Sequence, residues 1–195
     1  MYDDDVYKQV AELHIIGIDQ GFLSSLGKKF LVLLYKAIDE SDDSVLIVEN
    51  ENGVITGFIS GGHGMRSIYK RMILHFPQLM LALLPQILNP LKLWGILEIL
   101  THQRHDGINA DISRLPHHEL FSVVVAPNYR GKGIAEKLYS SLCRYFSEHG
   151  VNEFKILVGK NLEAAHHFYQ RMGAKAKLET NLHKGDTSII YIQRI

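Results

Sequence analysis

VVVAPNYRGKGIAEKL, residues 123–138, is the stretch that decides the fold. It opens with the end of an apolar run that is typical of a buried, central β-strand. A short loop with two glycines follows, and the amphipathic pattern of a helix begins directly after it. A buried strand that leads through a tight loop into a helix is a building unit of sheets that are covered by helices.

The loop of this unit predicts a site for an anion. Gly131 and Gly133 allow the backbone to approach a ligand closely. The first turn of the next helix offers unpaired N–H groups at the positive end of its dipole, and Arg130 and Lys132 add positive charge. The spacing matches neither the P-loop nor the GxGxxG fingerprint. We interpret the segment as a phosphate-binding turn. A plain strand–helix turn that uses glycine for its geometry is the alternative.

These residues resemble the pyrophosphate loop of the GNAT superfamily of acyl-CoA-dependent N-acyltransferases. That loop reads Arg/Gln-x-x-Gly-x-Gly/Ala, and this chain has RGKGIA at residues 130–135. The resemblance implies that backbone N–H groups of the loop hold the pyrophosphate of acetyl-CoA, while the strand before it aligns the pantetheine arm. The coenzyme-binding residues implied in this segment are Val123, Val125, Arg130, Gly131, Lys132, Gly133, Ile134 and Ala135.

A second element of the same family follows in NLEAAHHFYQRMGA, residues 161–174. It is similar to the family's Asn-x-x-Ala-x-x-x-Tyr-x-x-x-Gly-Phe helix, and Tyr169 and Gly173 keep the family spacing. Asn161 lies one residue early relative to the tyrosine, and Ala174 replaces the phenylalanine. The resemblance implies that Tyr169 protonates the departing thiolate and that Asn161 contacts the coenzyme.

Transfer to an amine also needs a base, because a protonated amine has no lone pair. Glu119, at the start of the central strand, is one candidate, since many members of the family carry a catalytic glutamate at a similar place. His117 is the other, because it points the same way as Glu119 in an alternating strand and a histidine is a competent base near neutral pH. Both residues stay open as the base.

Composition excludes several classes of protein. The 195 residues include 21 Lys and Arg and 21 Asp and Glu, so no basic excess favours nucleic acid. A single cysteine, Cys143, excludes a disulfide framework and a cysteine-built zinc site. The histidines at positions 102–118 follow no ligand motif, so we expect no metal. Residues 1–9 lack the pattern of a signal peptide, which makes the cytoplasm the expected location.

Around the central unit the chain predicts a single domain of the α/β or α+β class, with a mixed central sheet flanked by helices. Asn52-Gly53 between two β-rich runs is the signal for a first β-hairpin. The expected segments are N-terminal helices at 1–43, the hairpin at 45–61, a mostly helical insert at 65–117, the acyl-CoA-binding strand–loop–helix at 119–160, and a C-terminal helix and β-hairpin at 161–195. The N-terminal segment predicts two helices, and the apolar spacing of the second continues from residue 22 to residue 34.

The insert at 65–117 lies outside the family pattern. Its residues 72–88 carry no formal charge, but the run is too short and too often interrupted by proline and histidine to span a membrane. A buried helical hairpin, a dimer surface and a surface for apolar substrate or lipid are the three interpretations. Its place before the central strand predicts that it walls the acceptor side of the site, and a homodimer is a further expectation.

Taken with the resemblance, these patterns predict an N-acetyltransferase that moves an acetyl group from acetyl-CoA to a primary amine by direct attack. Residues 13–38, with the terminal HKGDTSIIYI at residues 183–192, also resemble a GNAT subgroup of bacterial surface-polysaccharide gene clusters. That likeness implies an amino sugar as the acceptor, either an amino-sugar nucleotide or a lipid-linked amino sugar. Two alternatives stay open: a non-catalytic acyl-CoA-binding sensor or partner module, and a transferase for longer acyl chains.

Overall fold

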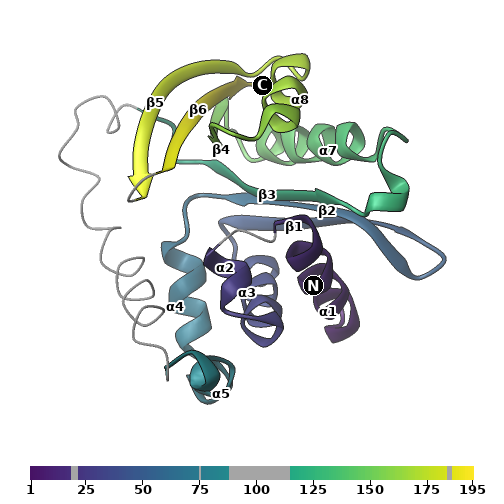
Figure 1. Cartoon of the computed structure of the whole chain (residues 1–195), viewed down its shortest axis with the longest axis vertical. Helices are drawn as coiled ribbons and strands as arrows, with labels where there is room; N and C mark the ends of the chain where they lie inside the picture. The colour runs from purple at the N-terminus through teal and green to yellow at the C-terminus, as the bar shows by residue number, and fades with distance from the viewer. Residues whose placement is uncertain (19–21, 75, 88–114, 184–185) are drawn as a thin grey trace.

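The protein, described here from a computed structural model, is built around one mixed sheet. The described residues are 1–18, 22–74, 76–87, 115–183 and 186–195. Within them the sheet has six strands in the order β1-β2-β3-β4-β6-β5 (Figure 1). The strands are β1 (Ser44–Glu51), β2 (Val54–Gly62), β3 (Glu119–Val125), β4 (Glu153–Gly159), β5 (Lys175–His183) and β6 (Asp186–Arg194). The predicted fold class, one α/β domain with a mixed sheet, is confirmed.

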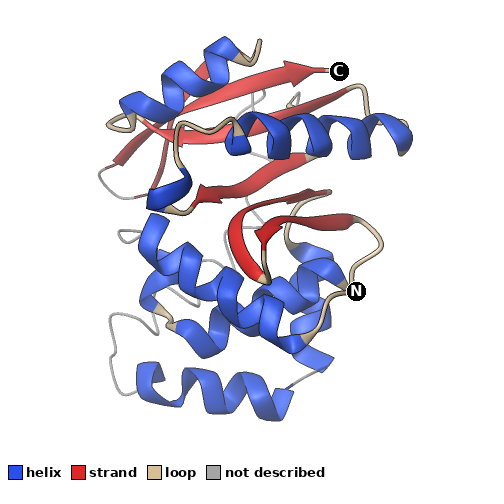
Figure 2. Cartoon of the chain, turned by 90° about the vertical axis from the view of Figure 1, so that its right-hand side faces the viewer, coloured by secondary structure: helices blue, strands red, loops and turns tan. Residues whose placement is uncertain are grey.

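Helices cover both faces of this sheet (Figure 2). They are α1 (Asp4–Gly17), α2 (Phe22–Ser25), α3 (Lys28–Asp39), α4 (Arg66–Leu74), α5 (Phe76–Ile87), α7 (Ile134–Glu148) and α8 (Glu163–Arg171). α1 and α3 pack around Phe58 of β2 on one face. On the other face, α7 buries Leu138, Leu142 and Phe146, which share one stripe of the helix because they are four residues apart.

The pairing of β3 differs on its two sides. With β2 it forms an antiparallel ladder that runs from Gly57↔Val125 to Gly62↔Glu119. With β4 it pairs in parallel only at Glu119 and Leu120. Since the described pairing with β4 ends at Leu120, the two strands separate toward the carboxyl end of β3. This opening leads directly to the loop before α7.

The amino-terminal region departs from the sequence prediction at one point. The apolar spacing after residue 21 predicts one continuous helix, but the structure has two, α2 and α3. Gly27 between them has φ +89°, in the left-handed region where an α-helix cannot continue. The chain therefore turns at Gly27 and starts α3 at Lys28.

A buried polar chain ties α1 and α3 to the centre of the sheet. His14 Nδ1 lies 2.5 Å from the Tyr35 hydroxyl, which lies 3.0 Å from Ser122 Oγ of β3. Ser122 Oγ in turn lies 2.9 Å from Ser60 Oγ of β2. Burial lowers the pKa of His14 to about 4, so its ring is neutral at neutral pH. These hydrogen bonds hold β3 against helices α1 and α3.

The predicted insert begins with two helices, α4 and α5. Of residues 65–117, those at 75 and 88–114, which include His102 and His105, lie outside the described residues. Ile68 and Met72 of α4 are buried in the core with α3. The uncharged run is only partly buried in the described chain, because its exposed apolar side chains include Ile73, Leu74, Met80 and Leu81. None of the helices in the described residues is long and apolar enough to cross a membrane.

Candidate active site

The turn between β3 and α7 forms one end of the candidate site. The 3₁₀ turn η2 (Pro127–Tyr129) redirects the chain, and Gly131 and Gly133 then have φ +75° and +77°. A Cβ added at either glycine would meet nothing within 4 Å. The two positions therefore require glycine for the left-handed backbone conformation, and their outer side is open.

The first turn of α7 faces this opening without a side-chain cap. Gly133 is the N-cap and has no side chain that could accept a hydrogen bond from the first N–H groups. These donors and the helix dipole favour a negative group. The carboxylate of Glu136 lies at this helix end. Hydrogen bonds from its own backbone N–H, and then from the guanidinium of Arg171, hold its pKa below the usual range.

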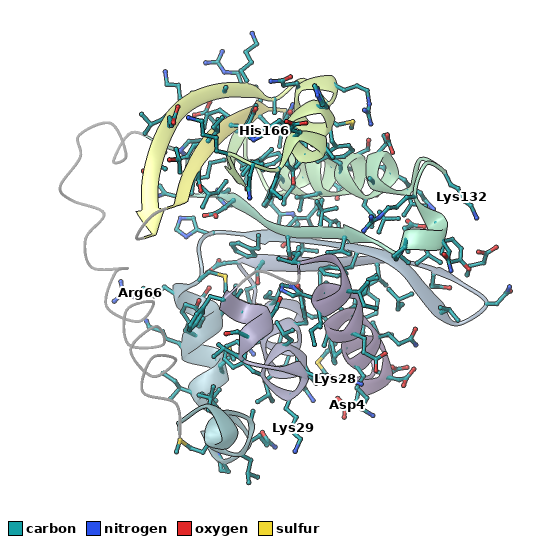
Figure 3. All side chains as sticks on the ribbon, in the orientation of Figure 1. Asp4, Lys28, Lys29, Arg66, Lys132 and His166 are labelled. Carbon is teal, nitrogen blue, oxygen red and sulfur yellow. The ribbon has the colours of Figure 1, made fainter. Side chains whose placement is uncertain are left out.

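A pocket of about 240 Å³ lies against the loop. Its lining residues are Val125, Tyr129, Arg130, Gly131, Gly133, Ile134, Ala135, Glu136 and Arg171. Of the predicted coenzyme residues in segment 123–135, only Val123 and Lys132 are absent from this lining. Lys132, on the loop (Figure 3), instead places its Nζ 4.6 Å from the centroid of the Tyr129 ring. The predicted phosphate turn and the pocket therefore coincide.

Two glutamates at the end of β1, Glu49 and Glu51, contact the loop and the start of α7. A hydrogen bond with the Glu51 carboxylate raises the pKa of the Tyr129 phenol. One helical turn further along α7, Lys137 Nζ donates to Glu49 Oε2 at 2.6 Å. Both contacts join β1, at one edge of the sheet, to the segment that lines the pocket.

The backbone of β3 continues the site along the strand. Ala126 N–H donates to the Thr56 carbonyl at 2.9 Å, on the β2 side. Because backbone groups alternate in direction, those of Val125 and Val123 face the β4 side, where the described pairing with β4 has ended. The carbonyl of Val125 accepts a hydrogen bond from Arg130 Nε at 3.3 Å. A row of backbone groups next to the loop thus borders the opening between β3 and β4.

Tyr169 lies in the core on the α7 face of the sheet. Its side chain is 6% exposed, and its ring centroid is 6.0 Å from that of Tyr139 and 6.4 Å from that of Tyr191. Within the described parts of the chain its hydroxyl has no hydrogen-bond partner. Burial raises the pKa of this phenol, which therefore stays protonated at neutral pH.

Glu119 is on the first of the two rungs that β3 and β4 share. Its Oε2 lies 3.6 Å from Nζ of Lys155, its partner in the parallel register, and its side chain is 27% exposed. Burial, and then the negative charge of Glu119, raise the pKa of Tyr69 in α4 to about 12. The carboxylate is therefore held between β4 and α4, at the end of β3 that is remote from the loop.

Three histidines gather beside this end of β3. His117 is exposed, and its ring centroid is 5.5 Å from that of His63, which directly follows β2. His118 packs against Phe146, and its ring centroid is 5.0 Å from that of His63. Burial, and then its two histidine neighbours, lower the pKa of His118. In the described ranges no group of three or more His, Cys, Asp or Glu side chains could hold a metal ion.

The remaining predicted residues lie elsewhere on α8 and the segment before it. Asn161 is exposed in the segment that precedes α8 and does not line the pocket. His166, on α8 (Figure 3), is within hydrogen-bonding distance of the Tyr191 hydroxyl at 2.9 Å and the Gly159 carbonyl at 3.1 Å. Its ring therefore joins α8 to the sheet.

Sequence reasoning did not identify two charged residues of the pocket, Arg171 and Glu136. Arg171 Nη2 donates to Glu136 Oε1 at 2.6 Å, which joins the end of α8 to the start of α7. The available signal was the position of Arg171, two residues after Tyr169 in the last turn of the second family element. That spacing does not reveal which element the side chain contacts.

Residues 18–174 match the model of the acetyltransferase (GNAT) family. No curated protein matches the chain. Solved structures with a similar fold include the PaiA N-acetyltransferase from Thermoplasma acidophilum in complex with coenzyme A, at 12% identity, TM-score 0.61, and coverage of 100% of this chain and 96% of that chain. An aminoglycoside 6'-N-acetyltransferase complexed with coenzyme A has 11% identity, TM-score 0.61, and coverage of 98% and 92%. An acetyltransferase of the GNAT family from Streptococcus pneumoniae has 13% identity, TM-score 0.58, and coverage of 100% and 96%.

At sequence identities this low, the similar structures support the fold alone. The family model matches most of the chain and therefore shows the family. It spans α3, the first hairpin, the loop between β3 and α7, and α8. The chain therefore belongs to the GNAT family of acetyltransferases, which are transferases that act on acyl groups.

Proposed function

We propose that the protein is an N-acetyltransferase that moves an acetyl group from acetyl-CoA to a primary amine of a small molecule. The observation that carries the proposal is the turn before α7. There, two glycines with positive φ, an uncapped helix start and Arg130 surround one pocket. A pyrophosphate is the part of acetyl-CoA that such a site binds. Two of the structurally similar acetyltransferases are complexes with coenzyme A.

In this proposal the pantetheine arm lies along Val125 and Val123, in the opening between β3 and β4. The amine nitrogen attacks the thioester carbonyl, so a C–N bond forms and the C–S bond breaks. Glu119 accepts the proton that the amine loses, directly or through water. Tyr169 gives its proton to the departing thiolate. Its hydroxyl is protonated and has no hydrogen-bond partner among the described residues, which supports this role.

We expect the Glu119→Gln variant to lose the acidic limb of the pH–rate profile of kcat/KM, because an amide does not titrate. Its kcat should fall by about 10²–10⁴-fold, the usual contribution of a positioned base. Thiol release from acetyl-CoA, measured from about pH 5 to 9, reads out both effects. If the limb persists in Glu119→Gln and disappears in His117→Ala, the base is the histidine.

For the acceptor we propose an amino sugar of surface-polysaccharide biosynthesis, supplied as an amino-sugar nucleotide in the cytoplasm. The support is the resemblance of residues 13–38, whose helices cover the face of the sheet opposite α7. A panel of amino-sugar nucleotides, aminoglycosides, polyamines and peptides in the thiol-release assay tests this proposal. Preference for any other amine rejects the amino sugar.

The same panel separates the enzyme from its alternatives. Coenzyme binding without thiol release for any amine would favour the non-catalytic acyl-CoA sensor or partner module. Native mass spectrometry of the purified protein tests the third function, because a longer acyl-CoA that co-purifies would favour transfer of longer chains. Acetyl-CoA as the retained thioester supports the acetyltransferase.

We also propose that the apolar side chains on α4 and α5 form a homodimer contact. Leu81 is 63% exposed and Leu74 is 78% exposed, which is unusual for side chains of this type when they cluster. Leu81→Glu is expected to give a folded monomer in light scattering, whereas the unaltered protein is a dimer. An unaltered protein that is already monomeric, or a Leu81→Glu variant that stays dimeric, would reject this contact.

A further inference from the structure

Arg171 lies at the end of α8 and lines the pocket. Its side chain is 60% exposed although its guanidinium has two neighbours. The guanidinium carbon lies 5.6 Å from the ring centroid of Phe168, one turn earlier in α8. Nη2 donates to Glu136 Oε1 at 2.6 Å. The ring and the carboxylate therefore orient a cation that lines the pocket.

The carboxylate that Arg171 contacts occupies a position suited to a phosphate. Glu136 is the third residue of α7, and its carboxylate accepts a hydrogen bond from its own backbone N–H. It therefore places a negative charge at the positive end of the helix dipole. An anionic ligand of the turn would compete with this carboxylate for the helix end and for Arg171.

A guanidinium has more donors than this contact uses. A guanidinium has five N–H groups, and the hydrogen bond that Arg171 makes within the described residues is to Glu136 Oε1. The donors lie in a planar fork that matches two oxygens of a phosphate. Arg130 also lines the pocket, so the two guanidinium groups together would offer a phosphate two positive charges.

We propose that Arg171 is a phosphate ligand for the coenzyme and that Glu136 holds its guanidinium until the phosphate displaces the carboxylate. The inference rests on the proposed binding of acetyl-CoA at the turn. It assigns opposite effects to two residues of one ion pair: Arg171 strengthens coenzyme binding, and Glu136 weakens it. The phosphate is either the pyrophosphate or the ribose 3'-phosphate, which share the same chemistry.

The test compares the binding of coenzyme A and of dephospho-coenzyme A by calorimetry. Arg171→Gln is expected to bind coenzyme A about tenfold more weakly or worse, as for the loss of a charged hydrogen bond. Glu136→Gln is expected to bind it several-fold more tightly. Arg194→Gln is the matched control, since Arg194 also forms an exposed ion pair, with Glu153, and does not line the pocket.

The two ligands identify which phosphate Arg171 contacts. If Arg171→Gln loses affinity for coenzyme A alone, Arg171 contacts the 3'-phosphate. If it loses affinity equally for coenzyme A and dephospho-coenzyme A, Arg171 contacts the pyrophosphate. Arg171→Gln affinity within twofold of the unaltered protein, or an equal loss in Arg194→Gln, overturns the inference. If Glu136→Gln binds coenzyme A with unchanged or weaker affinity, the proposed displacement of the Glu136 carboxylate by a phosphate is overturned. Failure of the unaltered protein to bind either ligand would overturn the proposed function as well.

Discussion

The Gly133→Asp variant should bind acetyl-CoA at least about 100-fold more weakly than the unaltered protein, the size expected when two charged hydrogen bonds are lost. Gly133 is the N-cap of α7, and its φ of +77° belongs to the left-handed region. An aspartate there places its carboxylate beside the first N–H groups of the helix and accepts their hydrogen bonds. The pyrophosphate would then lose these donors and meet a like charge.

Two further glycine variants separate the added charge from backbone strain. Gly150 is at the other end of α7 with φ +73°, and a Cβ there would also meet nothing within 4 Å. Gly150→Asp therefore carries the same strain and the same charge, but it should bind acetyl-CoA normally in calorimetry. Gly133→Ala adds strain without charge and should lose far less affinity than Gly133→Asp. A folded Gly133→Asp variant with normal affinity would refute the coenzyme site.

Tyr169→Phe should lower kcat by about 10²–10⁴-fold and leave the Kd for acetyl-CoA unchanged. The hydroxyl makes no hydrogen bond within the described residues, so its removal leaves the described hydrogen bonds of the core intact. Burial keeps the phenol protonated, and its proton is therefore available to the thiolate. Thiol release under saturating acetyl-CoA and amine measures kcat, and calorimetry measures the Kd.

Tyr139→Phe is the matched control for this prediction. Tyr139 lies in the same core cluster, but its hydroxyl donates to Gln193 Oε1 at 2.9 Å. Its removal should cost about 1 kcal/mol of the free energy of unfolding while kcat stays the same. Tyr169→Phe is thus expected to lower kcat, whereas Tyr139→Phe is expected to lower the free energy of unfolding and leave kcat unchanged. Normal turnover by Tyr169→Phe, or an equal loss of kcat in Tyr139→Phe, would reject Tyr169 as the acid.

The strand–loop–helix unit could be predicted because its signals are local. An apolar strand, two glycines and a four-residue apolar repeat stand next to one another in the chain, and each acts on its own backbone. The loop residues 130–135 needed no distant partner to be recognised. The same reasoning overlooked the break at Gly27, because apolar spacing continues through a residue whose φ of +89° ends the helix.

The second family element could be located in the sequence, but its surroundings could not. Spacing alone identified Tyr169 as part of a helix, and only packing against α7 and β6 buries its ring and raises the pKa of its phenol. Burial depends on atoms from elements that are distant along the chain. For the same reason the exposed position of Asn161, outside the pocket lining, could not be read from its place in a motif.

The amino-acid sequence by itself determined the glycine-containing turn at residues 130–135, the helix that follows it and the order of most strands and helices, since periodicity and glycine act over a few residues. Tertiary structure alone decided the opening between β3 and β4, which depends on where a parallel ladder ends. It also brought Arg171 to Glu136 across 35 residues and His63 to His117 from the end of another strand. Such contacts follow from how helices and strands pack on one sheet, and no local pattern in the chain encodes that arrangement.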